Sequence, residues 1–174
     1  FELNKRTELQ LLPSFLEPAE AGRNIGLLSE AGVPAVADPG SKIVRMAHQR
    51  GIEVVPLVGP SSILLALMAC GMSGQRFTFH GYLSAQRAQL AKDLRRLEQQ
   101  ALRQQATQLF IETPYRNRAV LETAIQQLSP QTYFTVAVDL TLPSQEIIAH
   151  TIAHWQQLAL PDLHKRPAVF VLGK

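Results

Sequence analysis

The chain has 174 residues, of which 46% are hydrophobic and 18% are charged, and this mixture excludes a disordered or fibrous protein. No apolar run reaches the roughly 20 residues that a helix needs to cross a bilayer, so we expect no membrane span. The formal net charge of +3 is mildly basic, which is compatible with an RNA partner without requiring one.

The start of the chain suggests that a segment precedes it. The sequence opens at Phe1 with no initiator methionine, and its first residues are typical of the approach to a helix. We therefore expect the first strand and helix of the domain to be missing. In nucleotide-binding α/β folds a cofactor loop often lies in that segment.

The first half of the chain alternates short apolar runs with helical stretches. Residues 25–29 and 52–57 are predicted to be buried strands, and each is followed by a loop and a helix. The first helix is predicted at residues 41–50, capped by Ser41, and the second ends at Gly71. Strand, loop and helix repeated in this way are typical of a parallel α/β sheet.

Cys70 is the only cysteine, which excludes an intrachain disulfide. It lies in an apolar stretch without a basic neighbour that would activate a thiol, so we interpret it as a core residue and not as a nucleophile. Together with the absence of a signal peptide, this favours a cytoplasmic protein.

The pattern of predicted elements changes after Gly74. We therefore predict an N-terminal α/β domain at residues 1–74 and a C-terminal mixed-sheet α/β domain at residues 75–174. About five strands and three helices are expected in the second domain, as a mixed sheet with helical cover. The strands are predicted at residues 77–80, 107–112, 132–139, 145–149 and 168–172, and the two longer helices at residues 84–105 and 117–128. The longest helix carries one apolar stripe, formed by Leu90, Leu94, Leu97 and Ala101.

Three loops rich in small residues directly follow predicted strands, at residues 29–40, 58–62 and 112–117. In an open α/β sheet, ligands bind beyond the carboxyl ends of the strands, and small residues let a ligand approach the backbone. One such loop is usually a simple turn. Three in the same position relative to their strands indicate a ligand site.

Residues 29–40 read Ser-Glu-Ala-Gly-Val-Pro-Ala-Val-Ala-Asp-Pro-Gly, and residues 52–61 end in Val-Gly-Pro-Ser. This pair of motifs resembles the tetrapyrrole-methylase superfamily of S-adenosylmethionine-dependent methyltransferases. The most similar branch 2′-O-methylates a cytidine ribose in small-subunit ribosomal RNA. The resemblance continues through residues 79–83, Glu112 and the closing strand, and so covers essentially the whole chain.

The resemblance implies two α/β domains with the cofactor cleft between them, a homodimer, and S-adenosylmethionine as cofactor. It also implies that the first strand and helix of the family are absent from this sequence. Carried over residue by residue, it assigns the cofactor contacts to Glu30, Ala31, Gly32, Ala35, Ser61, Ser62, Glu112, Leu140 and Ala168.

Two departures from the ribosomal branch lie on the side of the methyl acceptor. Leu142 stands where the branch has a lysine, and Ser84 follows the Gly-Tyr-Leu motif where the branch has a proline. Three hypotheses therefore stay open: methylation of RNA ribose, methylation of a small tetrapyrrole-like molecule, and a cofactor-binding module without catalysis.

No residue can be assigned to catalysis from the sequence, but Asp139 and Arg116 are candidates. Asp139 is expected either to accept a proton or to bond to backbone. Arg116 is expected either to bind an acceptor phosphate or to pair with Glu112 or Glu122.

Two further patterns concern binding. His150 and His154 have the i, i+4 spacing of a metal site on a helix, but no third ligand accompanies them, so we predict no metal. The long helix carries basic residues that form either a solvated face or an RNA-contacting one: Arg87, Lys92, Arg95, Arg96 and Arg103.

Overall fold

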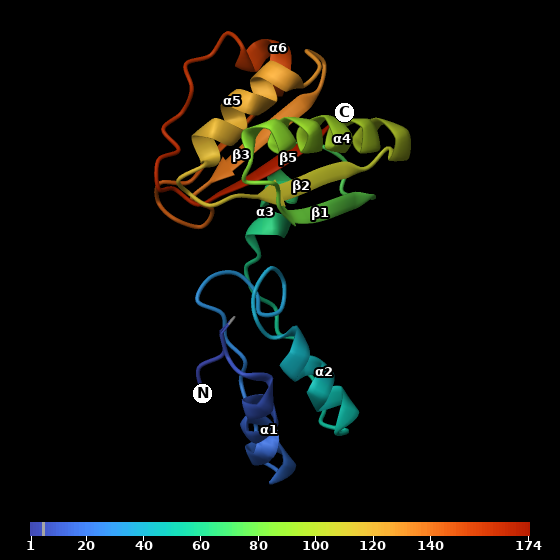
Figure 1. The fold of residues 1–174 in the computed structure, drawn as a ribbon, viewed down its shortest axis with the longest axis vertical. Helices are drawn as coiled ribbons and strands as arrows, with labels where there is room; N and C mark the ends of the chain where they lie inside the picture. Colours follow the sequence, from blue (N-terminus) through green and yellow to red (C-terminus); the bar gives the residue numbers. More distant parts are fainter. Residues whose placement is uncertain (5) are drawn as a thin grey trace. The chain divides into compact units, whose positions relative to one another are not determined.

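The structure is a computed structural model that describes residues 1–4 and 6–174. The chain divides into two compact units, Phe1–Ser61 and Ser62–Lys174, which are described separately below (Figure 1). The domain boundary predicted after Gly74 stays a prediction, because compactness alone does not define the domains of the whole protein.

The second unit is built on a five-stranded mixed sheet with the order β1-β2-β5-β3-β4. Strands β1 and β2 are parallel, and the remaining neighbours are antiparallel. The mixed sheet of five strands is therefore confirmed. Each predicted strand begins and ends within three residues of the observed bounds. The strands are β1 (Phe77–Tyr82), β2 (Thr107–Ile111), β3 (Tyr133–Val138), β4 (Glu146–Thr151) and β5 (Ala168–Gly173).

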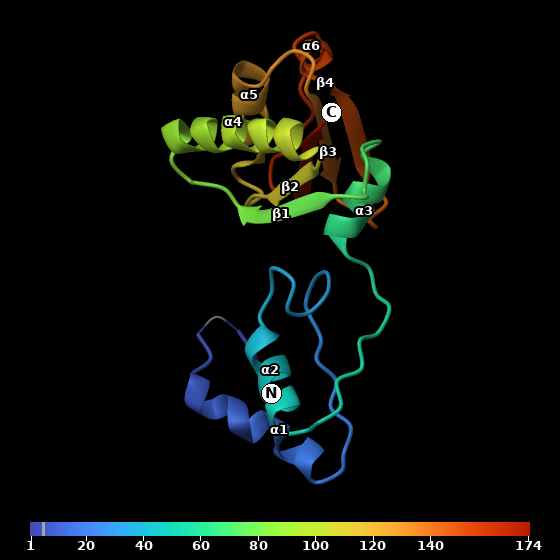
Figure 2. The same cartoon turned by 90° about the vertical axis from the view of Figure 1, so that its right-hand side faces the viewer.

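Helices cover both faces of this sheet, as Figures 1 and 2 show. On one face, α4 (Arg87–Gln104), α5 (Asn117–Gln127) and the short α6 (Ile152–Trp155) enclose the larger apolar cluster. The stripe predicted on the long helix is buried in this cluster, which confirms the pattern. Helix α4 begins at Arg87, three residues later than predicted.

The opposite face of the sheet is covered by α3 (Ser62–Ala69), whose apolar residues pack against β2 and β5. Cys70 follows this helix and is fully buried, and burial raises the pKa of its thiol despite backbone hydrogen bonds that lower it. Its interpretation as a core residue is consistent with this position. Because helices cover both faces, the central strands β3 and β5 are buried along almost their whole length.

The first unit contains a 3-10 turn, η1 (Leu9–Leu11), and two helices, α1 (Leu12–Glu20) and α2 (Ser41–Gln49). Its core is a small cluster formed by Leu12, Leu16, Ile43 and Ala47. Helix α2 lies where it was predicted, but Gly40 is its N-terminal cap and no side chain caps it, so the predicted Ser41 cap is wrong.

The two strands predicted in the first unit are also wrong. Residues 25–29 and 52–57 belong to no strand, and no strand occurs among the residues that the structure describes in this unit. A strand exists only when a neighbour pairs with its N–H and C=O groups, and no described segment of the unit does so. As a result, several apolar side chains of these stretches are exposed, with Leu28 at 90% and Leu57 at 86%.

None of the helices in the described part of the chain is both long and apolar enough to cross a membrane.

Candidate functional site

The loop of residues 29–40 in the first unit is a compact, strained turn. Gly32, Ala35, Ala37 and Gly40 all have positive φ angles, of 77°, 67°, 57° and 140°. The N–H of Ala35 donates to the carbonyl of Pro39 at 3.3 Å, which closes the turn. A Cβ atom on Gly40 would lie 3.2 Å from the Ala35 nitrogen, so this position requires glycine.

Residues 58–61 of the second small-residue loop lie beside the first loop within the same unit. A Cβ atom on Gly59 would lie 3.9 Å from Cγ1 of Val33, in ordinary contact distance. The structure therefore brings together two of the three loops that were predicted from the sequence. The predicted cofactor residues of this unit are Glu30, Ala31, Gly32, Ala35 and Ser61, and of these Ser61 is buried.

The other predicted cofactor residues belong to the second unit, and three of them meet at one edge of its sheet. Ala168 begins β5 and pairs with Val138, the last residue of β3, and the next residue of β5 pairs with Ile111, the last residue of β2. Glu112 and Leu140 follow β2 and β3 directly beyond this point. Ser62, in contrast, begins α3 on one face of the sheet.

Glu112 is held in place by a buried ion pair. Its side chain is 2% exposed, and Nη1 of Arg116 lies 3.0 Å from its Oε2 atom, although without hydrogen-bond geometry. Its Oε1 atom accepts from the Thr113 N–H at 2.7 Å. Arg116 also donates from Nη2 to the Ser84 carbonyl at 2.8 Å. Of the alternatives for Arg116, the structure shows the pair with Glu112.

Asp139 lies at the same sheet edge and is paired with Arg166, which donates from Nε to Oδ2 at 2.7 Å. Ser144 donates to the same oxygen at 2.9 Å. Burial raises the pKa of Asp139, but the hydrogen bonds from Arg166 and Ser144 and the charge of Arg166 outweigh it, so the pKa lies below the ordinary value. A carboxylate held in this way is a weak proton acceptor, which favours the structural alternative for Asp139.

Arg166 and Asn117 were missed by sequence reasoning. Asn117 is fully buried and donates from Nδ2 to the Arg166 carbonyl at 2.6 Å, which links the loop after β2 to the segment before β5. No local pattern marks either residue, because their partners lie far away in the sequence. The only available signal was the position of Arg166 two residues before a predicted strand.

The two histidines with metal-ligand spacing lie on different elements. Thr151 caps α6 between them, accepting from the His154 N–H at 3.3 Å, so His150 lies in β4 and not on the same helix. The two imidazole rings stack with centroids 4.4 Å apart. Across the described residues there is no group of three metal-ligating side chains.

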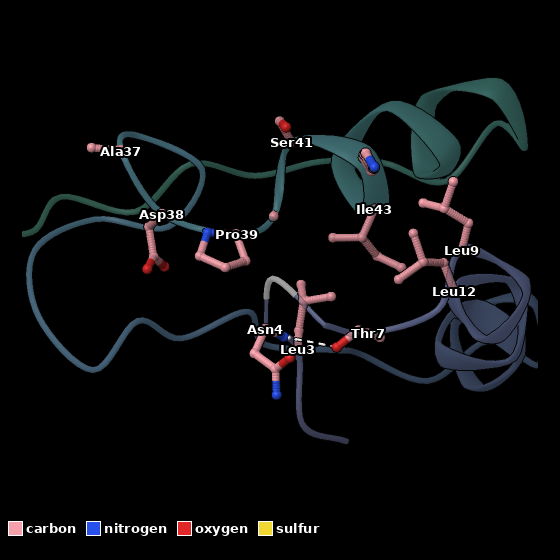
Figure 3. A pocket seen from close by; sticks show the side chains of 12 residues that line it. Leu3, Asn4, Thr7, Leu9, Leu12, Ala37, Asp38, Pro39, Ser41 and Ile43 are labelled. Atoms are coloured by element: carbon pink, nitrogen blue, oxygen red, sulfur yellow. Dashed lines mark hydrogen bonds between the residues drawn. The ribbon is translucent and has the colours of Figure 1, made fainter. Parts of the chain in front are cut away.

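The first unit also contains a cavity of about 410 Å³ that residues 37–40, at the end of the 29–40 loop, help to line (Figure 3). It is lined by residues of the amino-terminal segment, among them Leu3 and Leu9, and by residues 37–43. Glu30, Ala31 and Gly32 do not line it, so this cavity and the predicted cofactor contacts are different surfaces of the loop.

Comparisons with known proteins agree with the motifs. The ribosomal RNA small subunit methyltransferase I of Haemophilus influenzae is 33% identical over 172 residues, which are 99% of this chain and 59% of that protein. The chain therefore spans less than two thirds of the length of this curated relative.

Solved structures share the fold. The methyltransferase CobJ is 25% identical with a TM-score of 0.61, over 97% of this chain and 72% of that one. A uroporphyrin-III C-methyltransferase from Thermus thermophilus, solved with S-adenosylhomocysteine, is 14% identical with a TM-score of 0.50, over 97% of this chain and 74% of that one, which shows the fold alone. These likenesses confirm the α/β fold class. Since residues 2–156 match the sequence model of the tetrapyrrole (corrin/porphyrin) methylases, the chain belongs to that family.

Proposed function

We propose that the protein is a methyltransferase that uses S-adenosylmethionine. The observation that carries the proposal is the sheet edge of the second unit, where Glu112, Leu140 and Ala168 come together from three separate strands. Family membership and the names of the relatives support the same activity.

The residues at this edge fit the cofactor chemically. Methyl transfer removes the positive charge of a sulfonium, so it is favoured in a dry site without fixed charge of its own. The Glu112 carboxylate is neutralised by Arg116, and Ala168 is a small buried residue beside it. In the first unit, Gly32 has open space around its Cα, which leaves its backbone accessible. When bound, S-adenosylmethionine supplies an electrophilic methyl group.

The contribution of the chain would then be binding and alignment. Holding methyl donor and acceptor in line can lower a barrier by up to roughly 7–11 kcal/mol in ideal cases, and no strong nucleophile is required. Neither Asp139 nor Arg116 is free for the reaction, because each is held in an ion pair. A ribose hydroxyl would need another proton acceptor or an ordered water molecule.

For the acceptor we propose a ribose of small-subunit ribosomal RNA. The relatives of 30–36% identity are named as methyltransferases of small-subunit ribosomal RNA, and the ribose is what the sequence resemblance implies. The basic side chains of α4 support it, because all are exposed: Arg87, Lys92, Arg95, Arg96 and Arg103. Such a substrate would place the reaction in the cytoplasm.

A small tetrapyrrole-like acceptor is the second candidate. Some of the solved structures that share the fold are named as methyltransferases of such molecules, for example the uroporphyrin-III enzyme. The loss of a lysine at Leu142 favours it, because an RNA phosphate would lose a cationic partner there.

A methyl-transfer assay with the full-length protein separates these functions. Tritiated S-adenosylmethionine would be offered with small ribosomal subunits, with free cellular RNA and with a metabolite extract. We expect the label in small-subunit RNA. Label only in the metabolite fraction would replace the RNA acceptor by a small molecule, and binding of the cofactor without transfer to any fraction would favour the non-catalytic module.

We also propose a twofold homodimer, as the family resemblance implies. Exposed apolar side chains on α3 support an interface, since Leu64 is 51% and Met68 is 79% exposed. Light scattering of the full-length protein at micromolar concentration should give twice the monomer mass, and a monomer alone would contradict the proposal.

A further inference from the structure

The loop of residues 139–145 between β3 and β4 has an unusual backbone. Asp139 and Thr141 have φ angles of 50° and 74°, which place two non-glycine residues in the left-handed region within a three-residue stretch. Such a conformation is strained and persists only when the surroundings hold it. The loop therefore needs an anchor outside its own backbone.

Arg166 is that anchor. Its Nε atom donates to Asp139 Oδ2 at 2.7 Å and its Nη2 atom donates to the Ser144 carbonyl at 2.7 Å. Arg166 therefore forms hydrogen bonds with both ends of the loop. Its Nη1 atom lies 2.7 Å from Glu146 Oε1 and donates to the Asp162 carbonyl at 2.9 Å. All three guanidinium nitrogens are engaged in different directions, a geometry that only the planar fork of arginine provides.

Bonds within the loop complete the clamp on either side of Leu140. The N–H of Leu142 donates to the Asp139 carbonyl at 2.9 Å, and the N–H of Thr141 donates to Gln145 Oε1 at 2.9 Å. The Leu140 side chain is half-buried against the apolar cluster under α3. Leu140 is thus fixed in position by its two neighbours and by its own side chain.

The backbone of Leu140 itself is uncommitted. Among the hydrogen bonds of the described residues, none uses its N–H or its C=O. A held residue with free backbone groups, at the sheet edge that also carries Glu112 and Ala168, is suited to bind the polar groups of a ligand.

We infer that Arg166 is a positioning residue for the cofactor, which holds Leu140 and its free backbone groups in the conformation that binds S-adenosylmethionine. The inference rests on the proposed function, because it takes the sheet edge to be the cofactor site. Arg166 touches only the loop and its surroundings, so it would act through the loop and not by contact with the cofactor.

The test is the affinity of the full-length protein for S-adenosylhomocysteine, measured by calorimetry, together with the thermal midpoint of each variant. Arg166→Gln removes the anchor, and Arg166→Lys keeps the charge but cannot reach all four partners of the guanidinium. Both should weaken binding at least about tenfold, because the loop must then be ordered on binding. Arg118→Gln is the matched control: it breaks an exposed ion pair with Glu122 on the adjoining helix α5 and should leave affinity unchanged.

Each outcome decides the question. If both Arg166 variants are less stable but bind as the parent does, Arg166 has only a structural role and the inference is overturned. If Arg166→Lys binds with the affinity of the parent, a positive charge is sufficient and the geometry of the clamp is not required, which also overturns the inference. If the parent protein fails to bind S-adenosylhomocysteine, the proposed function fails first. To separate folding from positioning, Glu146→Gln removes only the charge of the outermost partner of Arg166, whose side chain is 47% exposed, and should weaken binding less than Arg166→Gln does.

Discussion

The two units of this chain differ in how their loops are supported. In the second unit, the sheet is buried on both faces, and the loops at its edge are fixed by the ion pairs of Glu112 with Arg116 and of Asp139 with Arg166. In the first unit, a small apolar cluster joins the helices, and the 29–40 loop is held by backbone turns.

This difference indicates a division of roles. The second unit is a scaffold whose stability comes from its core, so most single changes at its edge should leave the fold intact. The loops of the first unit depend on backbone conformations that only a few residue types adopt, so changes there should act on binding before they act on the scaffold. The following predictions test this contrast, from the largest expected effect to the smallest.

Truncation of the central phenylalanine should have the largest effect. Phe170 is fully buried and its ring stacks on that of Phe110 at 5.1 Å, so Phe170→Ala should destabilise the second unit by about 3–5 kcal/mol. Trp155 is the only tryptophan and is buried in the same cluster, so its fluorescence during urea unfolding reports this unit. Ile43→Ala, in the core of the first unit, should leave the Trp155 transition in place. A common shift in both variants would show that the units unfold together.

Backbone strain introduced into the 29–40 loop should weaken cofactor binding. Gly32 has φ +77° with open space around it, so Gly32→Val strains the backbone and should weaken binding of S-adenosylhomocysteine at least tenfold, about 1.4 kcal/mol. Gly22→Val is a close control, because Gly22 has φ +78°, equally open space and a place outside the loop. Equal affinity of both variants in calorimetry would remove the 29–40 loop from the site.

The basic face of α4 should contribute modestly to RNA binding. Arg95 and Arg96 are exposed, with Arg95 bonded to Gln127 at 3.2 Å and Arg96 located 3.6 Å from Asp93. Changing both to Gln should flatten the dependence of log affinity on log salt by about one or two units, because each phosphate contact releases counterions. Affinity for the cofactor should stay the same. An unchanged salt slope would make this helix a solvated face and favour the small acceptor.

The smallest effect is expected for the pH dependence of stability that Asp139 contributes. Arg166 and Ser144 lower the pKa of Asp139 in the folded protein below the value of about 3.9 that an unfolded chain has. The ionised carboxylate therefore stabilises the fold fully at pH values above about 3.9, and this contribution is lost as the pH falls through the folded pKa. Asp139→Asn should therefore be less stable than the parent near pH 6, with the difference shrinking toward pH 3. Urea midpoints at several pH values measure this. A gap that stays constant over that range would contradict it.

Much of the second unit could be predicted because its signals are local. The apolar stripe of α4 follows from helical periodicity, and β3 and β5 are rich in the β-branched and aromatic residues that favour strands. The small-residue loops were also visible, because glycine and proline impose turns whatever surrounds them.

Pairing choices were not visible in the sequence, because they join distant residues. Residues 25–29 have the composition of a strand, yet they form none, since strand formation depends on a partner and not on composition alone. Arg116 had three plausible partners, and the sequence did not decide between them even though its observed partner, Glu112, lies only four residues away.

The sharpest example is the clamp on Leu140. The family resemblance indicated Leu140 as a cofactor contact. Arg166 lies 27 residues after Asp139 and belongs to no recognisable motif. The antiparallel pairing of β3 with β5 brings the two to one sheet edge, and burial there makes an ion pair necessary. Residue types and periodicity thus define the elements and the candidate ligand positions, whereas the fold defines which charges meet, because electrostatic partners are chosen by distance in space.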